Sequence, residues 1–152
     1  MKYIRYIGLV IAILLVFTPL SFAEERYNVH VNVKCKDDVL KSSIESFMKR
    51  ELRNVGNINI TDTEPCFKLG IIATNILNIH TRPIGTVVIS TIVTFHAKDT
   101  PGSDIMDHIL ITGDGIDSIR ELCISLVVAF ETNTLEPIRE LKKEKRDEKT
   151  NY

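Results

Sequence analysis

The sequence lacks the concentrated basic patch that nucleic-acid binding requires. Its 152 residues carry 19 basic and 20 acidic side chains, a formal net charge of −1. The two signs are interleaved along the chain, most visibly in RELKKEKRDEK near the carboxyl end. Proteins that bind nucleic acid or an anionic membrane surface gather lysine and arginine on one face. The even mixture of charges therefore argues against both kinds of partner.

Motifs of common enzyme sites are also absent. The chain has no nucleophile elbow, no glycine-rich loop that would cradle a phosphate, and no recognised set of serine, histidine and acid. The segment GDGIDS (113–118) superficially resembles a calcium loop but lacks its alternating acids and distant glutamate. These absences favour a non-enzymatic protein that needs no cofactor.

Long apolar runs are rare, and the one extended run lies near the amino end. It follows a basic start, is interrupted by Pro19, and leads into small side chains at Ser21 and Ala23, the positions that a signal peptidase recognises. This order is typical of a secretory signal peptide. The sequence therefore predicts a signal peptide over 1–23 and a periplasmic or secreted location for the rest of the chain.

A retained membrane anchor is the alternative for the same segment, because residues 4–23 reach the roughly 20 residues that a spanning helix needs. Cleavage would remove Lys2 and Arg5 and leave 129 residues with 17 basic and 20 acidic side chains, a formal charge of −3. A chain of this length encloses one core. We therefore expect one domain over 24–141, no membrane association after cleavage, and a charged tail over 142–152.

The spacing of apolar residues predicts a strand, a helix and a second strand. YNVHVNVKC (27–35) alternates apolar and polar side chains with the period of a half-buried strand. DDVLKSSIESFMKRELRNVG (37–56) has apolar residues at helical spacing, with Asp37 as its N-cap and Gly56 at its end. With NINITDTE (57–64) as a short strand, this unit is a right-handed crossover between parallel neighbours.

Three further strands are expected in the middle of the chain. CFKLGIIATNIL (66–77) and TVVISTIVTFHA (86–97) flank a turn that contains Pro83 and Gly85. DHILITGD (107–114) follows a polar loop. These three segments are predicted to form an antiparallel run.

A second helix is predicted after GDG, where Ser118 and Glu121 stand in capping-box spacing. Its apolar stripe includes Cys123. Asn133, Thr134 and Pro137 are expected to interrupt this helix, and Pro137 is expected to begin a further segment that is a solvated helix or a frayed tail. The elements together predict a two-layer α+β fold. One mixed sheet of about five strands carries two main helices on one face, in the order β-α-β-β-β-β-α, and a charged helical tail follows.

This order of elements, with CFKLGIIA and TVVISTIV in the middle strands, resembles the small α/β modules of bacterial envelope proteins, such as the amino-terminal domain of the TolB type. The resemblance covers most of the mature chain and rests on element order and strand pattern. It implies an assembly or accessory role in the cell envelope. The partner would be another envelope protein or a second copy of this chain.

Three cysteines in an exported chain leave at most one internal pair. Cys35 closes the first predicted strand and Cys66 follows the second. Because parallel neighbours end at the same edge of a sheet, this placement predicts a Cys35–Cys66 disulfide. Cys123 lies on the apolar stripe of the second helix and is expected to be a buried free thiol.

One face of the predicted sheet has a composition that suits binding. The third and fourth strands place five side chains there: Ile72, Thr74, Ile76, Ile92 and Thr94. This face is too apolar to be left bare and too polar for a core. Because two helices are expected to cover only the other face, these residues are predicted to bind a partner.

The alternative function is a small metal-dependent or hydrolytic enzyme. His96 and His108 bracket a polar loop, and together with Asp104 and Asp107 they form a candidate set of ligands for a divalent metal. Their spacing matches no recognised ligand pattern, and aspartate and glycine are the usual residues of turns. The sequence therefore favours the binding module.

We expect the mature protein to begin at Glu24, because the small side chains that precede it fit a signal peptidase. Intact-mass measurement and amino-terminal sequencing of protein purified from its native host decide this. A chain that still begins at Met1 and fractionates with membranes would instead support the anchor.

Overall fold

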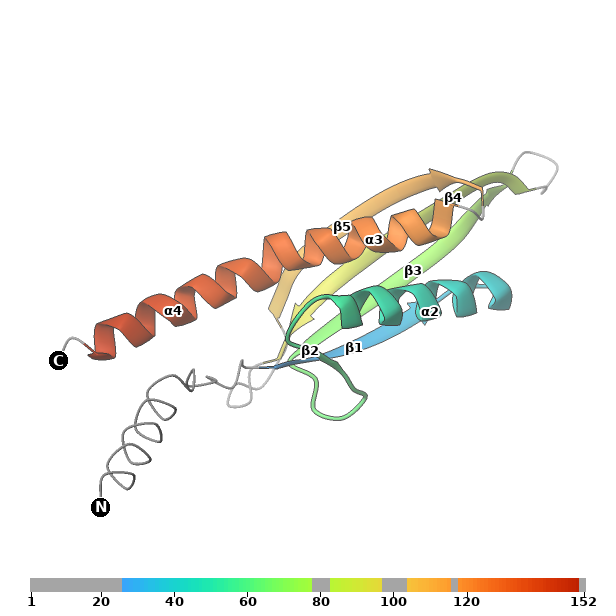
Figure 1. Ribbon diagram of the computed structural model, residues 1–152. Coiled ribbons are helices and arrows are strands. Elements are labelled where there is room, and N and C mark those ends of the chain that lie inside the picture. Colours follow the sequence, from blue (N-terminus) through green and yellow to red (C-terminus); the bar gives the residue numbers. More distant parts are fainter. Residues whose placement is uncertain (1–25, 78–82, 97–103, 116–117, 151–152) are drawn as a thin grey trace, which may run out of the picture.

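Two layers, a sheet and its helices, make up the computed structural model, which describes residues 26–77, 83–96, 104–115 and 118–150 (Figure 1). The predicted signal peptide lies outside these residues. Both helices that cover the sheet lie on the same face of it, and the last helix extends past the sheet (Figure 1). The predicted α+β fold class is confirmed. No helix among the described residues has the length and apolar character to cross a membrane.

The sheet has five strands in the spatial order β2-β1-β3-β4-β5. The strands are β1 (Tyr27–Lys34), β2 (Ile58–Ile60), β3 (Phe67–Leu77), β4 (Pro83–Phe95) and β5 (Asp104–Asp114). Strand β1 lies between β2 and β3 and pairs in parallel with both. Strands β3, β4 and β5 form the predicted antiparallel run. The sheet is therefore mixed, with the long strands on the side of β5.

The helical layer consists of α2 (Asp38–Asn54), α3 (Ile119–Phe130), a π-helical segment η2 (Glu131–Leu135) and α4 (Glu136–Thr150). Helix α2 begins at the predicted cap, because the Asp37 carboxylate accepts hydrogen bonds from the backbone N–H groups of Val39 and Leu40, at 2.9 and 3.0 Å. The cap satisfies two backbone donors that the first turn leaves without partners.

The core lies between the sheet and α2 and α3, and Phe67 joins the two layers. Between ring centroids, Phe67 lies 5.2 Å from Phe95 of β4 and 5.6 Å from Phe130 of α3. The ring of Tyr27 of β1 lies 5.9 Å away. Aromatic pairs at these distances add to the stabilisation from apolar burial. One ring therefore ties three strands to the second helix.

Ser118 caps α3 differently from the expected capping box. It is the N-cap residue, but its side chain makes no hydrogen bond to the first turn of the helix. Its hydroxyl instead donates to the backbone carbonyl of Gly115, at 2.8 Å. The backbone of Ser118 is already helical rather than extended, and an N-cap side chain reaches the first turn from an extended backbone. Sequence spacing alone does not report this conformation.

Pro137 does not interrupt the helix as the sequence suggests. The chain passes from α3 through η2 into α4 without a break. In the widened segment, the N–H of Glu136 donates to the carbonyl of Glu131, five residues back. A proline has no N–H to donate and its ring crowds the preceding turn, so a wider turn placed just before it accommodates both defects.

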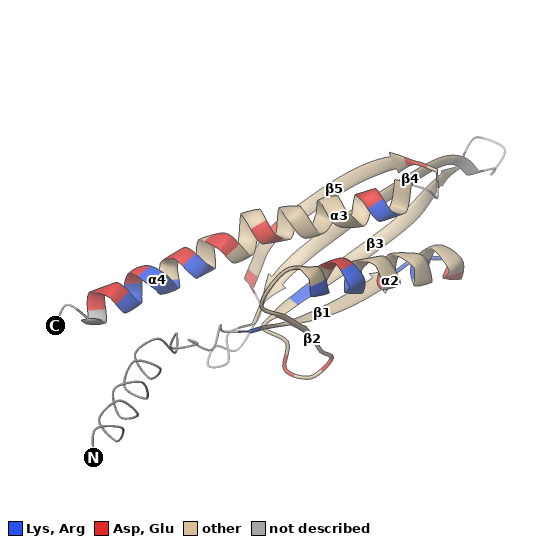
Figure 2. Ribbon diagram, viewed as in Figure 1, with Lys and Arg blue, Asp and Glu red and all other residues tan. Residues whose placement is uncertain are grey.

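Helix α4 is anchored at its start and charged beyond it. The guanidinium of Arg139 donates to the Glu131 carboxylate at 3.3 Å and to the carbonyl of Gly56 at 3.2 Å. The Lys142 ammonium lies 5.0 Å from the centre of the Tyr27 ring. Leu141 is 57% exposed. Figure 2 shows that the rest of α4 alternates acidic and basic residues, in keeping with the predicted solvated helical tail.

The expected Cys35–Cys66 disulfide is wrong, because both are separate half-buried thiols in the structure. The N–H of Cys66 donates to the carbonyl of Asn28, at the start of β1, whereas Cys35 follows the last residue of the same strand. Cys35 is seven residues after Asn28, a distance of roughly 20 Å along an extended chain. Strand β3 runs parallel to β1, so the residue that precedes β3 lies at the opposite end of β1 from Cys35.

Cys123 is expected to resist alkylation in the folded protein. Burial, followed by the negative charge of Glu51, raises the pKa of its thiol to about 12, and the thiolate is the reactive form. At about pH 8, timed iodoacetamide labelling followed by peptide mass spectrometry should show Cys35 and Cys66 modified well before Cys123. In denaturant, all three should react alike. Rapid labelling of Cys123 in the native state would contradict its burial.

Candidate binding face

The sheet surface that faces away from α2 and α3 is called the open face here. Residues on it are identified by the alternation of buried and accessible side chains in each strand and by the pairing register. Its accessible side chains include His30, Asn32, Lys34, Lys68, Ile72, Thr74, Ile76, Val88, Ser90, Ile92, Thr94, Ile105, His108, Leu110 and Thr112. No helix of the described structure covers it (Figure 1).

The structure places all five predicted binding residues on this face. Ile72, Thr74 and Ile76 come from β3, and Ile92 and Thr94 come from β4. Ile72 is 54% exposed, and Ile76 and Ile92 are each 38% exposed. In the register, Gly70 is opposite Ile92, so Ile72 and Ile92 are diagonal neighbours. The apolar side chains therefore form one surface that spans two strands.

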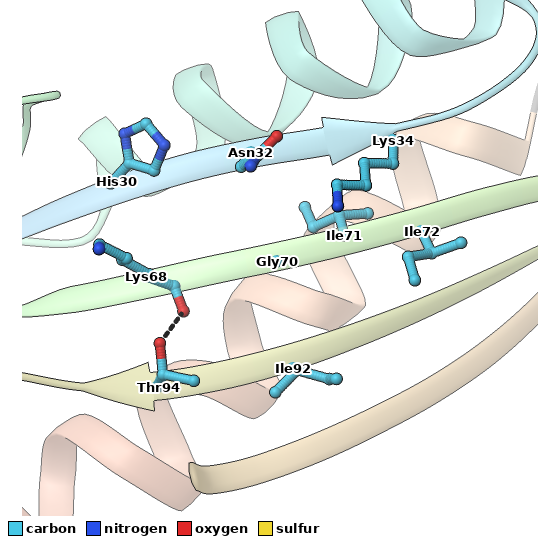
Figure 3. Close-up of a pocket in the computed structure, with 9 residues that line it drawn as sticks. All are labelled: His30, Asn32, Lys34, Lys68, Gly70, Ile71, Ile72, Ile92 and Thr94. Carbon is cyan, nitrogen blue, oxygen red and sulfur yellow. Dashed lines mark hydrogen bonds between the residues drawn. The ribbon is translucent and has the colours of Figure 1, made fainter. Parts of the chain in front are cut away.

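A hollow of about 400 Å³ lies at the centre of this face (Figure 3). It is lined by His30, Asn32, Lys34, Lys68, Gly70, Ile71, Ile72, Ile92 and Thr94. Gly70 is paired with Asn32 on one side and with Ile92 on the other. A Cβ atom built on Gly70 would meet only the Ile92 carbonyl oxygen, at 3.8 Å. The missing side chain of this glycine thus creates the floor of the hollow.

The two sides of the open face differ in chemical character. On the β1 side, Lys34 and Lys68 border the hollow, and no acidic residue lines it. Among the described residues, neither ammonium group has a hydrogen-bonding or acidic partner. On the β5 side, Ile105 and Leu110 are 70% and 62% exposed. The face therefore offers cationic groups next to apolar surface.

Hydrogen bonds hold several polar side chains of the face in place. The Nδ1 atom of His30 lies 2.9 Å from a carboxylate oxygen of Asp62. The Ser90 hydroxyl lies 2.9 Å from Nε2 of His108, and the Thr94 hydroxyl donates to the carbonyl of Lys68 at 3.4 Å. These bonds orient the imidazoles and the hydroxyls, whereas the ammonium groups of Lys34 and Lys68 make no such bond within the described residues.

The candidate metal ligands do not converge. His108 lies on the open face opposite Ile92 of β4. His96 follows the last residue of β4, four positions after Ile92. Asp107 accepts a hydrogen bond from Asn133 of η2 at 3.2 Å, which directs it toward the helical layer, and Asp104 is paired with Phe95 at the end of the strand. Within the described ranges, no three His, Cys, Asp or Glu side chains are placed to share a metal ion. The strand alternation separates residues that are close in sequence.

The sequence pattern did not indicate that Lys34, Lys68 and Gly70 would surround one hollow. Asn32 and Lys34 alternate with the buried valines of β1, so their accessibility was readable from the period of the strand. Their proximity to Lys68 and Gly70 was not, because it depends on the parallel pairing of β1 with β3. That pairing joins segments more than thirty residues apart.

Ile92→Lys should change the free energy of unfolding by about 1 kcal/mol or less, because the new ammonium reaches water from a partly exposed site. The matched control is Ile89→Lys on the same strand, since Ile89 is fully buried on the helix side. It should destabilise by roughly 3 kcal/mol or more, because it buries an unpaired charge. Urea unfolding of both variants measures this. Equal destabilisation by the two changes would show that the open face is core.

Comparison with known proteins shows a fold and no family. No family model and no curated protein matches this sequence. Among solved structures, a Xanthomonas campestris protein of the DUF330 family aligns with a TM-score of 0.57 and 8% identity, over 80% of this chain and 93% of its own. At this identity, the likeness establishes the arrangement of the strands and helices alone.

Two further structures align less well. The PelC dodecamer from Paraburkholderia phytofirmans has a TM-score of 0.43 and 11% identity, over 72% of this chain and 86% of its own. Rare lipoprotein B from Shewanella oneidensis has a TM-score of 0.40 and 12% identity, over 74% of this chain and 98% of its own. The fold of this chain is thus similar to that of a solved DUF330 protein, and its function has to be argued from its own open face.

Proposed function

We propose that this protein is an exported, non-enzymatic binding or assembly module of the cell envelope that acts through its open face. The observation that carries the proposal is the uncovered sheet surface. Ile72, Ile92 and Leu110 are exposed there on three neighbouring strands. Contiguous apolar surface of this kind on a soluble domain marks an interaction site.

The envelope location rests on the sequence. The predicted signal peptide would export the chain, and the order of elements resembles envelope modules of the TolB amino-terminal type. The partner would be another envelope protein or a second copy of this chain. The mixed character of the face suits such a partner, because interfaces that form after folding combine apolar contacts with polar and charged ones.

The sheet makes the face ready to bind without rearrangement. Strands β3 and β4 are paired on both edges, and the part of β1 that lines the hollow is paired with β3 through Lys34. Backbone hydrogen bonds therefore hold the relative positions of Ile72, Ile92 and Lys34 before any partner arrives, which lowers the entropy cost of association. Covering a partly exposed isoleucine contributes on the order of 1 kcal/mol. Several such side chains together support specific binding of a second protein.

Site-specific photo-crosslinking in the native host tests the proposal. A photoreactive phenylalanine analogue at position 72 or 92 should give a discrete adduct, because a partner covers these positions. The control is position 39. Val39 is 73% exposed but lies on α2, in the helical layer, and should give no adduct.

An adduct of twice the mass of the chain would identify a second copy as the partner, and another discrete mass would identify an envelope protein. Absence of an adduct at both open-face positions would contradict the proposal. Adducts at position 39 in the same yield as at positions 72 and 92 would also contradict the proposal, because they would show contact without preference for the open face.

A further inference from the structure

We infer that the hollow of the open face binds an extended acidic segment of a partner protein, with two carboxylates four residues apart and an apolar side chain midway between them. This inference rests on the proposed function, since it names the chemistry of the partner that the open face receives. It is carried by the position of Lys34 and Lys68 at opposite ends of the hollow and by the apolar surface between them (Figure 3).

The spacing of the two lysines follows from the parallel register. Lys68 is paired with His30, and Lys34 is paired with Ile72. The two lysines therefore lie four residues apart along adjacent parallel strands, roughly 13 Å at the rise of an extended chain. A second extended chain has the same rise, so its side chains i and i+4 lie on one face at the same separation. Carboxylates at those two positions would each meet one ammonium group.

The charges of the hollow favour anions. Its cationic side chains are Lys34 and Lys68, and none of the residues that line it is acidic. Asp62, whose carboxylate lies 2.9 Å from Nδ1 of His30, is not among the lining residues. Figure 3 shows Lys68 extending toward the His30 end and Lys34 bending over the opposite end. Two ammonium groups without an internal partner gain the most from an anionic ligand.

The centre of the hollow accepts an apolar side chain. Gly70 leaves the floor without a side chain, and Ile72 and Ile92 form one wall. The side chain i+2 of an extended segment points to the same face as i and i+4, about 7 Å from each. It would therefore enter the hollow above Gly70, between the two ion pairs.

A single-headed anionic lipid fits this arrangement less well. One head group would require cations gathered at one end and an apolar channel leading away from them. Here the cations stand at both ends, and the apolar surface lies between them. An extended segment with two separated anions meets both lysines at once, so a protein segment is the occupant that the geometry favours.

Fluorescence polarisation with synthetic peptides tests the inference on the mature chain. The probe carries the core Glu-Thr-Val-Thr-Glu. One comparison peptide replaces both glutamates by glutamine, and a second keeps the composition but places the glutamates side by side. The spaced acidic peptide should bind most tightly, because it alone satisfies both lysines. Its binding should weaken as the salt rises from about 0.1 M to about 1 M, where the screening length falls from about 10 Å to about 3 Å.

Three variants locate the binding. Lys34→Gln and Lys68→Gln should each weaken binding of the spaced peptide about three- to tenfold, because each removes one charged contact. Gly70→Val should abolish it by filling the floor, and the backbone has room for the added Cβ. Lys143→Gln on the exposed part of α4 is the matched control and should leave binding unchanged. Circular dichroism confirms that each variant is folded.

The outcomes separate this inference from the proposed function. Equal binding of all three peptides, or loss with Lys143→Gln as large as with Lys34→Gln, would overturn it. So would lysine-dependent binding to phosphatidylglycerol vesicles without binding of the spaced peptide. If crosslinks at positions 72 and 92 form in cells and persist in the Lys34→Gln, Lys68→Gln double variant, the proposed function stands and the acidic segment is wrong.

Discussion

The parallel pairing of β1 with β3 is the constraint on which the rest of the structure depends. It brings Val29 opposite Phe67 and Lys34 opposite Ile72. At one end of this register, the Phe67 ring enters the core and meets rings from three other elements. At the other end, the lysine reaches the open face. A shift of one residue would turn every side chain of β1 to the opposite face and remove both the core and the hollow.

The helical layer explains why one face of the sheet stays uncovered. The second half of that layer is one continuous run, α3-η2-α4, which the widened segment before Pro137 keeps unbroken. Because this run does not turn back, α2 and α3 cover one face, and α4 passes beyond the sheet (Figure 1). Arg139 holds its first turn against Gly56. The last helix is thus a charged extension, and no described helix covers the second face of the sheet.

The composition of the open face balances two requirements. Isoleucine and leucine provide apolar contact area, whereas lysine, threonine and asparagine keep the face hydrated when no partner is present. Figure 2 shows that charge is concentrated on the helices and is sparse on the strands. The few charges that border the hollow therefore act with little competition from neighbouring charges. The proposed partner would therefore be selected by the position of those charges as well as by apolar contact.

Local pattern determined much of this protein. The period of two in YNVHVNVKC, the helical stripe after Asp37 and the turn residues between strands predicted the elements and the α+β class, and strand alternation placed Ile72 and Ile92 on one face. Tertiary structure decided what depends on distant segments. The ends of β1 and β3 separate Cys35 from Cys66, the register brings Lys34, Lys68 and Gly70 around one hollow, and the π-helical turn accommodates Pro137. Periodicity in the sequence indicates which side chains of a strand or helix are buried and which are exposed. The three features above depend instead on which segments pair and in what register. Side-chain packing determines the pairing and the register only when the whole chain folds.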